Sequence, residues 1–320
     1  MAQTDIIGIC VSDWYGVRRA LRTYTDTIVS PAEAKFIIAA KQPKVVLFGC
    51  YMPEWEPILT YAREQGCVCV LTWFASYILN EFNNLNRRWL HAALDAYTRG
   101  LFTHIATPHH GLARTWSVRN YPTDYLPLTV NTDMPPATPR EGLHIGIFGS
   151  GQPWKNMECQ LVAASMISGA TIHVQQMPEQ KSALTSLRIP VEQHSYVRND
   201  AEYYQLLGSM TVNLCVSLSE TYSYLTAESF LMGTPVLTSH ITPIVRDLPY
   251  GHVLAVCRTS WFDDPEAIAM AIRTVIADRQ EIARVAPSYM RDYNAREQQQ
   301  ADTLRSFWHE QHPCLDCVRS

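Results

Sequence analysis

The sequence predicts an α/β protein made of two doubly wound halves, each a parallel sheet with helices on both faces. Short apolar runs alternate with segments of helical periodicity along the chain, and a proline-rich stretch interrupts that alternation near the middle. A length of 320 residues also exceeds the usual size of a single domain. Such sheets bind ligands at the carboxyl ends of their strands, which we expect to face a cleft between the halves.

The first half shows the alternation clearly. Short apolar runs bounded by turn signals are typical of buried parallel strands. Pro31 and Pro53 suit the first turn of a helix, where the missing N–H has no intrahelical partner to lose. The expected strands are 6–11, 44–49, 67–71, 101–107 and 125–130, and the expected helices are 31–40, 53–65, 80–97 and 109–119.

Residues 131–142 contain three prolines and no apolar periodicity, which is typical of a stiff linker. We therefore predict a Rossmann-like domain over residues 1–135 and another over 141–295, with a C-terminal helix and tail at 296–320 packing back on the first. In the second half the expected strands are 143–148, 170–174, 191–196, 210–216, 235–239 and 253–257, and the expected helices are 154–167, 201–207, 224–232, 265–278 and 295–309.

Composition and charge exclude several classes of protein. With 47% hydrophobic and 18% charged residues, the chain is typical of a folded globular protein and not of a disordered one. Its net charge of −4 argues against a globally cationic nucleic-acid binder. The charge is uneven, because residues 1–140 carry 13 Lys and Arg against 11 Asp and Glu, whereas residues 141–320 carry 13 against 19.

The nine cysteines are an odd number and stand mostly inside apolar runs, which indicates a reducing compartment. Cys314 and Cys317 form a close pair near His309 and His312. We interpret them as a solvated tail and not as a metal site. The chain shows no cleavable leader and no run of 18 apolar residues, so a cytoplasmic location without a transmembrane segment is expected.

The first chemical motif is Gly-Ser-Gly-Gln-Pro-Trp-Lys at residues 149–155, between an expected strand and an expected helix. Backbone N–H groups at such a turn favour phosphate, and Lys155 adds a positive charge. The third glycine of a dinucleotide fingerprint is missing, and so is the Gly-Lys-Ser/Thr end of a Walker loop. Taken alone, the motif fits a tight turn without a ligand equally well.

The second motif places two carboxylates eight residues apart. Glu220 stands in a polar turn after a strand, and Glu228 lies one to two turns into the following helix. The N–H groups at the start of that helix could hold a phosphate, while the carboxylates accept hydrogen bonds from hydroxyls of the same ligand. The structural alternative is a capping carboxylate and a solvent-facing helical glutamate.

Together the motifs resemble the donor domain of the retaining GT-B glycosyltransferases, in particular glycosyltransferase family 4. The glycine-to-lysine interval at 149–155 and the Glu-x7-Glu spacing at 220–228 match that family in order and distance. The resemblance covers the chain from about residue 100 onward. Further similar segments are the stretch entering the linker, the base-contacting strand and loop, the Gly-x-Pro-Val-x-x-Ser strand and the late helix, at 126–133, 191–207, 233–239 and 264–272.

The resemblance implies transfer of a sugar from a nucleotide-diphosphate sugar to an acceptor hydroxyl, with retention of anomeric configuration. Glu220 and Lys155 would be the catalytic pair: Lys155 neutralises the donor diphosphate, and Glu220 holds hydroxyls of the transferred sugar. Glu228 would accept hydrogen bonds from the ribose. The other implied donor-binding residues are Gly149, Ser150, Gly151, Tyr196, Arg198, Tyr224 and Leu225.

In such enzymes the leaving phosphate takes the acceptor proton, so neither a protein nucleophile nor a cofactor is required. No Asp-x-Asp cluster occurs, so no metal is expected, and Asp264 has the position of a helix N-cap. Two positions depart from the family. Ser150 replaces its usual arginine, and the β-branched Thr221 stands in a turn that usually contains glycine.

The first half would bind the acceptor. Gly16 and Arg18 follow the first expected strand and His109 follows a later one, so these residues are expected at strand ends; an exposed helical face is the alternative for Arg18. A saccharide or a lipid-linked hydroxyl is the favoured acceptor. Two alternatives stay open: a phage-type enzyme acting on a modified DNA base, and a non-catalytic subunit that binds nucleotide sugars.

Overall fold

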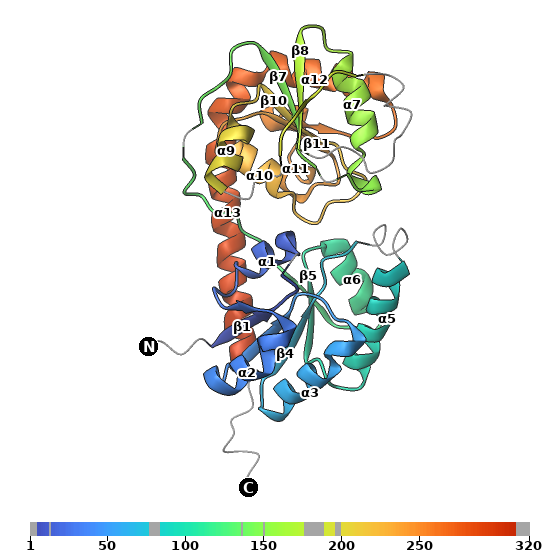
Figure 1. Ribbon diagram of the computed structural model, residues 1–320, viewed down its shortest axis with the longest axis vertical. Coiled ribbons are helices and arrows are strands. Elements are labelled where there is room, and N and C mark those ends of the chain that lie inside the picture. The colour runs from blue at the N-terminus through green and yellow to red at the C-terminus, as the bar shows by residue number, and fades with distance from the viewer. Residues whose placement is uncertain are drawn as a thin grey trace. The chain divides into compact units, whose positions relative to one another are not determined.

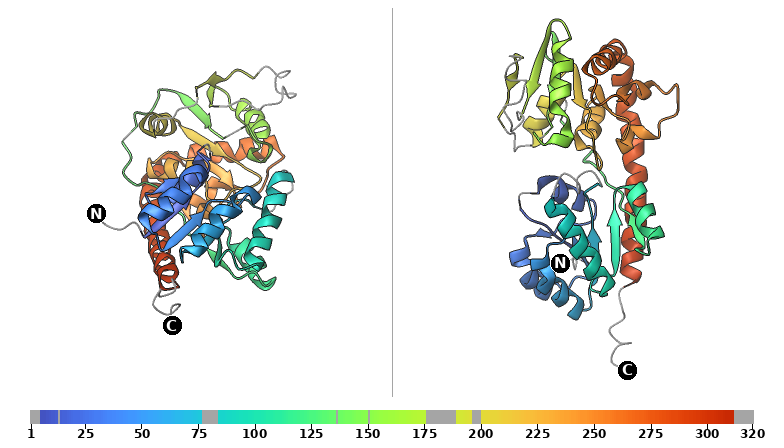
Figure 2. Two further views of the ribbon diagram at one scale, coloured as in Figure 1. Left: turned by 60° about the horizontal axis from the view of Figure 1, so that its bottom comes forward. Right: turned by 90° about the vertical axis from the view of Figure 1, so that its right-hand side faces the viewer.

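The computed structural model describes residues 5–12, 14–76, 84–135, 137–149, 151–175, 189–195 and 200–311, and the statements below refer to these. It confirms the predicted fold class, because the chain forms two six-stranded sheets in which every strand pair is parallel (Figure 1). The chain divides into two compact units, one of Met1–Thr129 with Ala295–Ser320 and one of Val130–Asn294. Helices cover both faces of each sheet (Figure 2).

The sheet of the first unit has the strand order β2-β1-β3-β4-β5-β6. β1, β3 and β4 are buried along their whole length, as expected for central parallel strands. The strands are β1 (Ile6–Ile9), β2 (Ile28–Val29), β3 (Val45–Phe48), β4 (Val68–Thr72), β5 (His104–Thr107) and β6 (Thr123–Tyr125). The helices are α1 (Tyr15–Leu21), α2 (Pro31–Lys41), α3 (Glu56–Glu64), α5 (Asn84–Thr98) and α6 (His110–Val118), with a 3-10 turn η1 (Pro53–Trp55).

The sheet of the second unit has the order β12-β11-β10-β7-β8-β9. The strands are β7 (Leu143–Ile147), β8 (Ala170–Val174), β9 (Glu192–Gln193), β10 (Val212–Cys215), β11 (Val236–Ser239) and β12 (Arg258–Thr259). The helices are α7 (Met157–Ser165), α9 (Asp200–Gly208), α10 (Tyr224–Leu231), α11 (Pro243–Arg246) and α12 (Pro265–Ala277), with 3-10 turns η2 (Pro153–Lys155) and η3 (Val253–Cys257).

The last helix, α13 (Arg279–Glu310), begins well before the residue 295 expected from the sequence. From Ala295 onward it groups with the first unit. There Trp308 is fully buried beside the ring of Tyr24, and Arg305 Nη2 donates a hydrogen bond to the Thr23 carbonyl over 2.7 Å. Trp308, in the last turn of α13, is therefore part of the core of the first unit.

Several local expectations differ from the structure. The strand expected at 125–130 is found earlier in the chain, as β6, and residues 126–130 are not in a strand. Residues Val253–Cys257 form a 3-10 turn and not a strand, because the His252 side chain accepts the N–H of Leu254 and turns the chain. Of the strand expected at 191–196, the described residues 191–195 form only the two-residue strand β9. The N-cap role of Asp264 is confirmed, since its carboxylate accepts the N–H of Ala267 over 3.0 Å. Within the described ranges, no helix combines the length and apolar character needed to cross a membrane.

Candidate functional site

In the second unit two loops leave neighbouring strands where the strand order reverses. β8 and β9 extend the sheet on one side of β7, whereas β10, β11 and β12 extend it on the other. The loop after β7 carries Gly149 and Lys155, and the loop after β10 carries Glu220. Open α/β sheets bind their ligands at this switch point, beyond the carboxyl ends of the strands. The two sequence motifs therefore meet at the position where a ligand is expected.

The centre of this site is an ion pair between Lys155 and Glu220. Lys155 Nζ lies 2.7 Å from Glu220 Oε1, and the side chains are 25% and 7% exposed. Burial works to lower the pKa of Lys155, but the Glu220 carboxylate outweighs it and the pKa is raised. Lys155 is therefore a positively charged group that still reaches solvent.

Cys215, at the end of β10, is a second hydrogen-bond partner of the Glu220 carboxylate. Its Sγ donates to Glu220 Oε1 over 3.5 Å, and its side chain also lies 3.3 Å from Ser223 Oγ. Burial raises the pKa of Cys215 to about 12, so the thiol stays protonated and acts as a donor. A neutral cysteine here is a hydrogen-bonding support for Glu220 and not a nucleophile.

Gln160, in α7, joins the two loops. Its Nε2 donates to the carbonyl oxygens of Lys155 (2.7 Å) and Asn156 (3.2 Å), and its Oε1 accepts the N–H of Val216 over 2.9 Å. The side chain is 2% exposed. Sequence reasoning missed this residue, although a glutamine among the apolar side chains of a helix that follows a phosphate-type turn was a usable signal.

Replacing Gln160 by leucine should lower the free energy of unfolding by about 1–2 kcal/mol, because the buried N–H of Val216 and carbonyl of Lys155 lose their partner. Urea unfolding followed by circular dichroism measures this. The same substitution at the exposed Gln300 is the control and should stay within about 0.5 kcal/mol of the parent. Equal stability of Q160L and the parent would contradict the role assigned to Gln160.

The turn before α10 takes a left-handed backbone at Ser223 (φ 67°) and not at Thr221. Ser223 is the N-cap, and its Oγ accepts the N–H of Thr226 over 3.3 Å. Tyr224 and Leu225 begin the helix, where N–H groups have no intrahelical acceptor and the helix dipole is positive. Thr221 therefore does not need the left-handed conformation that its β-branched side chain disfavours, because Ser223 adopts it instead. The N-terminus of α10 keeps its position after the turn.

Ser223→Ala should lower the free energy of unfolding by about 1 kcal/mol, because it removes the cap and keeps a side chain on a left-handed residue. Ser223→Gly removes the same cap but relieves the backbone strain, so it should cost only a few tenths of a kcal/mol. Thermal and urea unfolding of both variants measure the difference. A glycine variant less stable than the alanine variant would contradict this account.

Glu228 lies in the second turn of α10 and is fully buried. This excludes the solvent-facing alternative for this glutamate. A buried carboxylate is costly to hold in a folded protein, so it usually serves a specific polar interaction.

The glycine loop after β7 is described only in part. Gly149 does not have a positive φ, and a Cβ added there would lie 3.6 Å from Lys155 Cβ, which is an ordinary contact. Gly151 lies in the same loop, and Ser150, Tyr196 and Arg198 lie outside the described residues.

In the first unit the strand order reverses between β1 and β3. Gly16 is exposed and, with Arg18, lies on α1, which follows β1; Arg18 Nη2 donates to the Ile28 carbonyl over 3.4 Å. His109 precedes α6 at the end of β5, so β3 and β4 separate its strand from β1. The structure therefore places Gly16 and Arg18, and not His109, at the switch point.

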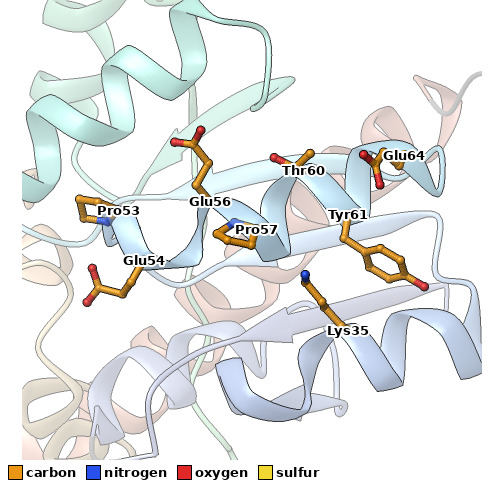
Figure 3. A pocket seen from close by; sticks show the side chains of 8 residues that line it. All are labelled: Lys35, Pro53, Glu54, Glu56, Pro57, Thr60, Tyr61 and Glu64. Atoms are coloured by element: carbon orange, nitrogen blue, oxygen red, sulfur yellow. The ribbon is translucent and has the colours of Figure 1, made fainter.

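Sequence reasoning missed the other side of that switch point. Gly49 follows β3, and a Cβ at this position would come within 2.8 Å of Val17 Cγ1 and 3.2 Å of the Ile9 carbonyl. A larger residue at this position would require the Val17 side chain to shift. A hollow in the same unit lies between α2 and α3, where the Lys35 ammonium is 5.8 Å from the Tyr61 ring (Figure 3). None of the predicted site residues lines this hollow.

No family model matches the chain, and no curated protein matches it in sequence. Many solved structures share its architecture. HepE of Anabaena in complex with UDP and glucose matches 95% of this chain and 100% of its own at 13% identity, with a TM-score of 0.71. Sucrose-phosphate synthase of Thermosynechococcus elongatus matches 87% of this chain and 77% of its own at 15% identity, with a TM-score of 0.65.

A trehalose-6-phosphate synthase, described in connection with glycosyl transfer with retention, matches 96% of this chain and 99% of its own. Its identity is 7% and the TM-score 0.62. These neighbours are GT-B glycosyltransferases. At such low identities the likeness shows the fold, and this chain has the GT-B fold.

Proposed function

We propose that this protein is a retaining glycosyltransferase that moves a sugar from a nucleotide-diphosphate sugar to an acceptor hydroxyl. The observation that carries the proposal is the Lys155–Glu220 pair beside the N-terminus of α10, at the switch point of the second sheet. The GT-B fold supports it, since the similar structures include HepE with UDP and glucose. We propose a saccharide or a lipid-linked hydroxyl as the acceptor, bound by the first unit.

The ion pair suggests how the donor is bound. Before binding, Glu220 neutralises the Lys155 ammonium. The arriving diphosphate replaces Glu220 as the partner of Lys155 and also meets the N–H groups of Tyr224 and Leu225. Glu220 is then able to accept hydrogen bonds from hydroxyls of the sugar. Binding of the negatively charged diphosphate needs a local cation such as Lys155, because residues 141–320 contain more acidic than basic side chains.

The proposed reaction needs no protein nucleophile. The acceptor oxygen forms a bond to the anomeric carbon on the face from which the diphosphate leaves, while the bond from that carbon to the phosphate oxygen breaks. The acceptor proton passes to the leaving phosphate oxygen. Lys155 and the start of α10 stabilise the charge that develops on the diphosphate. Departure and attack on one face give retention.

A thermal-shift screen with nucleotide-diphosphate sugars that differ in base and sugar tests the proposal. A donor at 100 times its Kd should stabilise the folded protein by about 2.7 kcal/mol. Proton NMR of the product from an active donor then reports the anomeric configuration. No stabilisation by any donor would contradict the proposal, and stabilisation without hydrolysis or transfer would identify a non-catalytic binding subunit instead.

A further inference from the structure

Three histidines and a glutamate form a connected row across β7, β8 and β9 of the second unit. His144 lies on β7, His173 on β8 and Glu192 on β9, and His194 follows β9 directly. His173 and Glu192 are register partners in the parallel pair β8–β9. His173 is fully buried, His144 and His194 are half-buried and Glu192 is exposed. None of the four is among the proposed donor-binding residues, although Glu192 and His194 lie in the segment 191–207 that resembles the base-contacting strand and loop.

The hydrogen bonds of this row fix the positions of its protons. His144 Nε2 lies 2.7 Å from the Glu141 carbonyl oxygen, which can only accept, so the proton is on Nε2. In a neutral imidazole His144 Nδ1 is then an acceptor, and it lies 2.8 Å from His173 Nε2, which must donate. The neutral His173 ring therefore has its lone pair on Nδ1.

That lone pair is directed at two further groups. His173 Nδ1 lies 3.2 Å from Glu192 Oε2 and 2.9 Å from His194 Nε2. The lone pair and the carboxylate oxygen repel each other at this distance, and a cation bound between them would relieve that repulsion.

We propose that His173 Nδ1, Glu192 Oε2 and His194 Nε2 bind a divalent transition-metal ion, of which Zn²⁺ is the best match. Two imidazole nitrogens and one carboxylate oxygen are an established ligand set for Zn²⁺, which then keeps a fourth position for water. Zinc ligands at roughly 2.0–2.1 Å in tetrahedral geometry lie about 3.3 Å apart. The three donor atoms lie within 4.8 Å of one another, so small rotations complete the site.

The surroundings fit this assignment. His173 Nε2 donates to His144 Nδ1, and His144 is in turn held by the Glu141 carbonyl, so the His173 ring is oriented by a hydrogen bond on the side away from the proposed metal. His194 also lines a surface hollow with Glu202 and Arg140, which gives the fourth position access to solvent. Arg140 Nη1 lies 3.6 Å from Glu192 Oε2 and is the cation that competes with the metal.

The site has a structural consequence. The ring of His194 contacts Phe148, the residue before Gly149, with ring centroids 6.4 Å apart. A metal bound to His173 and His194 would therefore fix the short strand β9 against β8, beside the start of the loop that carries Lys155. The assignment uses none of the proposed catalytic residues, so it does not depend on the proposed function.

Isothermal titration with ZnCl₂ of the full chain, freed of metal by a chelator, tests the site. Cys314 and Cys317 are changed to serine in all samples, so that terminal thiols do not contribute. We expect one Zn²⁺ per chain, and at least about tenfold weaker binding in His194→Gln and in Glu192→Gln. His91→Gln, at an exposed position in the other unit, is the matched control and should bind as the parent does.

Two further readouts separate metal binding from a hydrogen-bonded row. Co²⁺ should give the visible absorption of a tetrahedral site in the parent protein but not in His194→Gln. Arg140→Gln should tighten Zn²⁺ binding several-fold, because it removes the competing charge. If the parent fails to bind Zn²⁺ at one per chain, or if His194→Gln binds it unchanged, the site is wrong and His194 Nε2 simply donates to His173 Nδ1.

Discussion

Replacing Lys155 by alanine is expected to lower kcat/KM for the donor by roughly 10²–10³-fold, the usual effect of removing one charge-stabilising group at a leaving anion. The diphosphate gains negative charge as it departs, and Lys155 is the solvent-reaching cation paired with Glu220 at the switch point. The effect should fall on kcat as well as KM, because the interaction strengthens in the transition state. Steady-state kinetics with the donor found in the thermal-shift screen measure both.

The single variant also leaves the nearly buried Glu220 carboxylate without its cation, which would itself destabilise the fold. A double variant, K155A with E220Q, removes that unpaired charge. We expect it to recover stability relative to K155A but to stay as inactive. Lys44→Ala, at an exposed position in the first unit, is the control for loss of a lysine. Native transfer activity in K155A would show that Lys155 does not bind the diphosphate.

The features that the sequence predicted correctly are those whose pattern lies within one short continuous segment. Apolar runs bounded by turn signals predicted the central strands, and a proline or an acidic residue before a helix predicted starts such as that of α12 at Pro265. The two motifs after β7 and β10 were found because each is continuous in the chain. Parallel topology then brings them together at the switch point, which follows from the strand order.

The remaining features depend on contacts between distant segments. Gln160 acts by joining Lys155 and Val216, and its apolar neighbours in the helix indicate burial but do not identify these two partners. The histidine row is spread over more than 50 residues, and each histidine alone resembles an ordinary residue of a strand or loop. Register between β8 and β9 is what places His173 opposite Glu192, and register is set by the folded sheet.

Short edge elements were missed for a different reason. β2 and β12 have only two residues each, too few for a period to be visible in the sequence, whereas β9 lies inside the longer strand expected at 191–196. The apolar run 253–257 has the composition of a strand, yet the His252 side chain caps a 3-10 turn there. In so short a segment, one capping hydrogen bond is enough to favour a 3-10 turn over the strand that the apolar composition predicts.

Glu228→Gln should weaken binding of a nucleoside diphosphate by roughly 10- to 150-fold, which corresponds to about 1.5–3 kcal/mol for hydrogen bonds to a charged group. The amide keeps the shape of the side chain but removes its charge and one acceptor. Ribose hydroxyls that donate to both carboxylate oxygens would therefore lose most of that interaction. Isothermal titration with the nucleoside diphosphate alone measures the effect without any contribution from the sugar.

Glu266→Gln is the matched control, since it makes the same change at an exposed position on another helix of the same unit. Its affinity should equal that of the parent. The melting temperature of Glu228→Gln separates binding from folding, because a variant that melts normally but binds weakly has lost a ligand contact. Unchanged affinity would remove Glu228 from the donor site. The buried carboxylate would then be a structural feature of α10, and the proposed donor would be held by the Lys155–Glu220 pair and the N-terminus of α10.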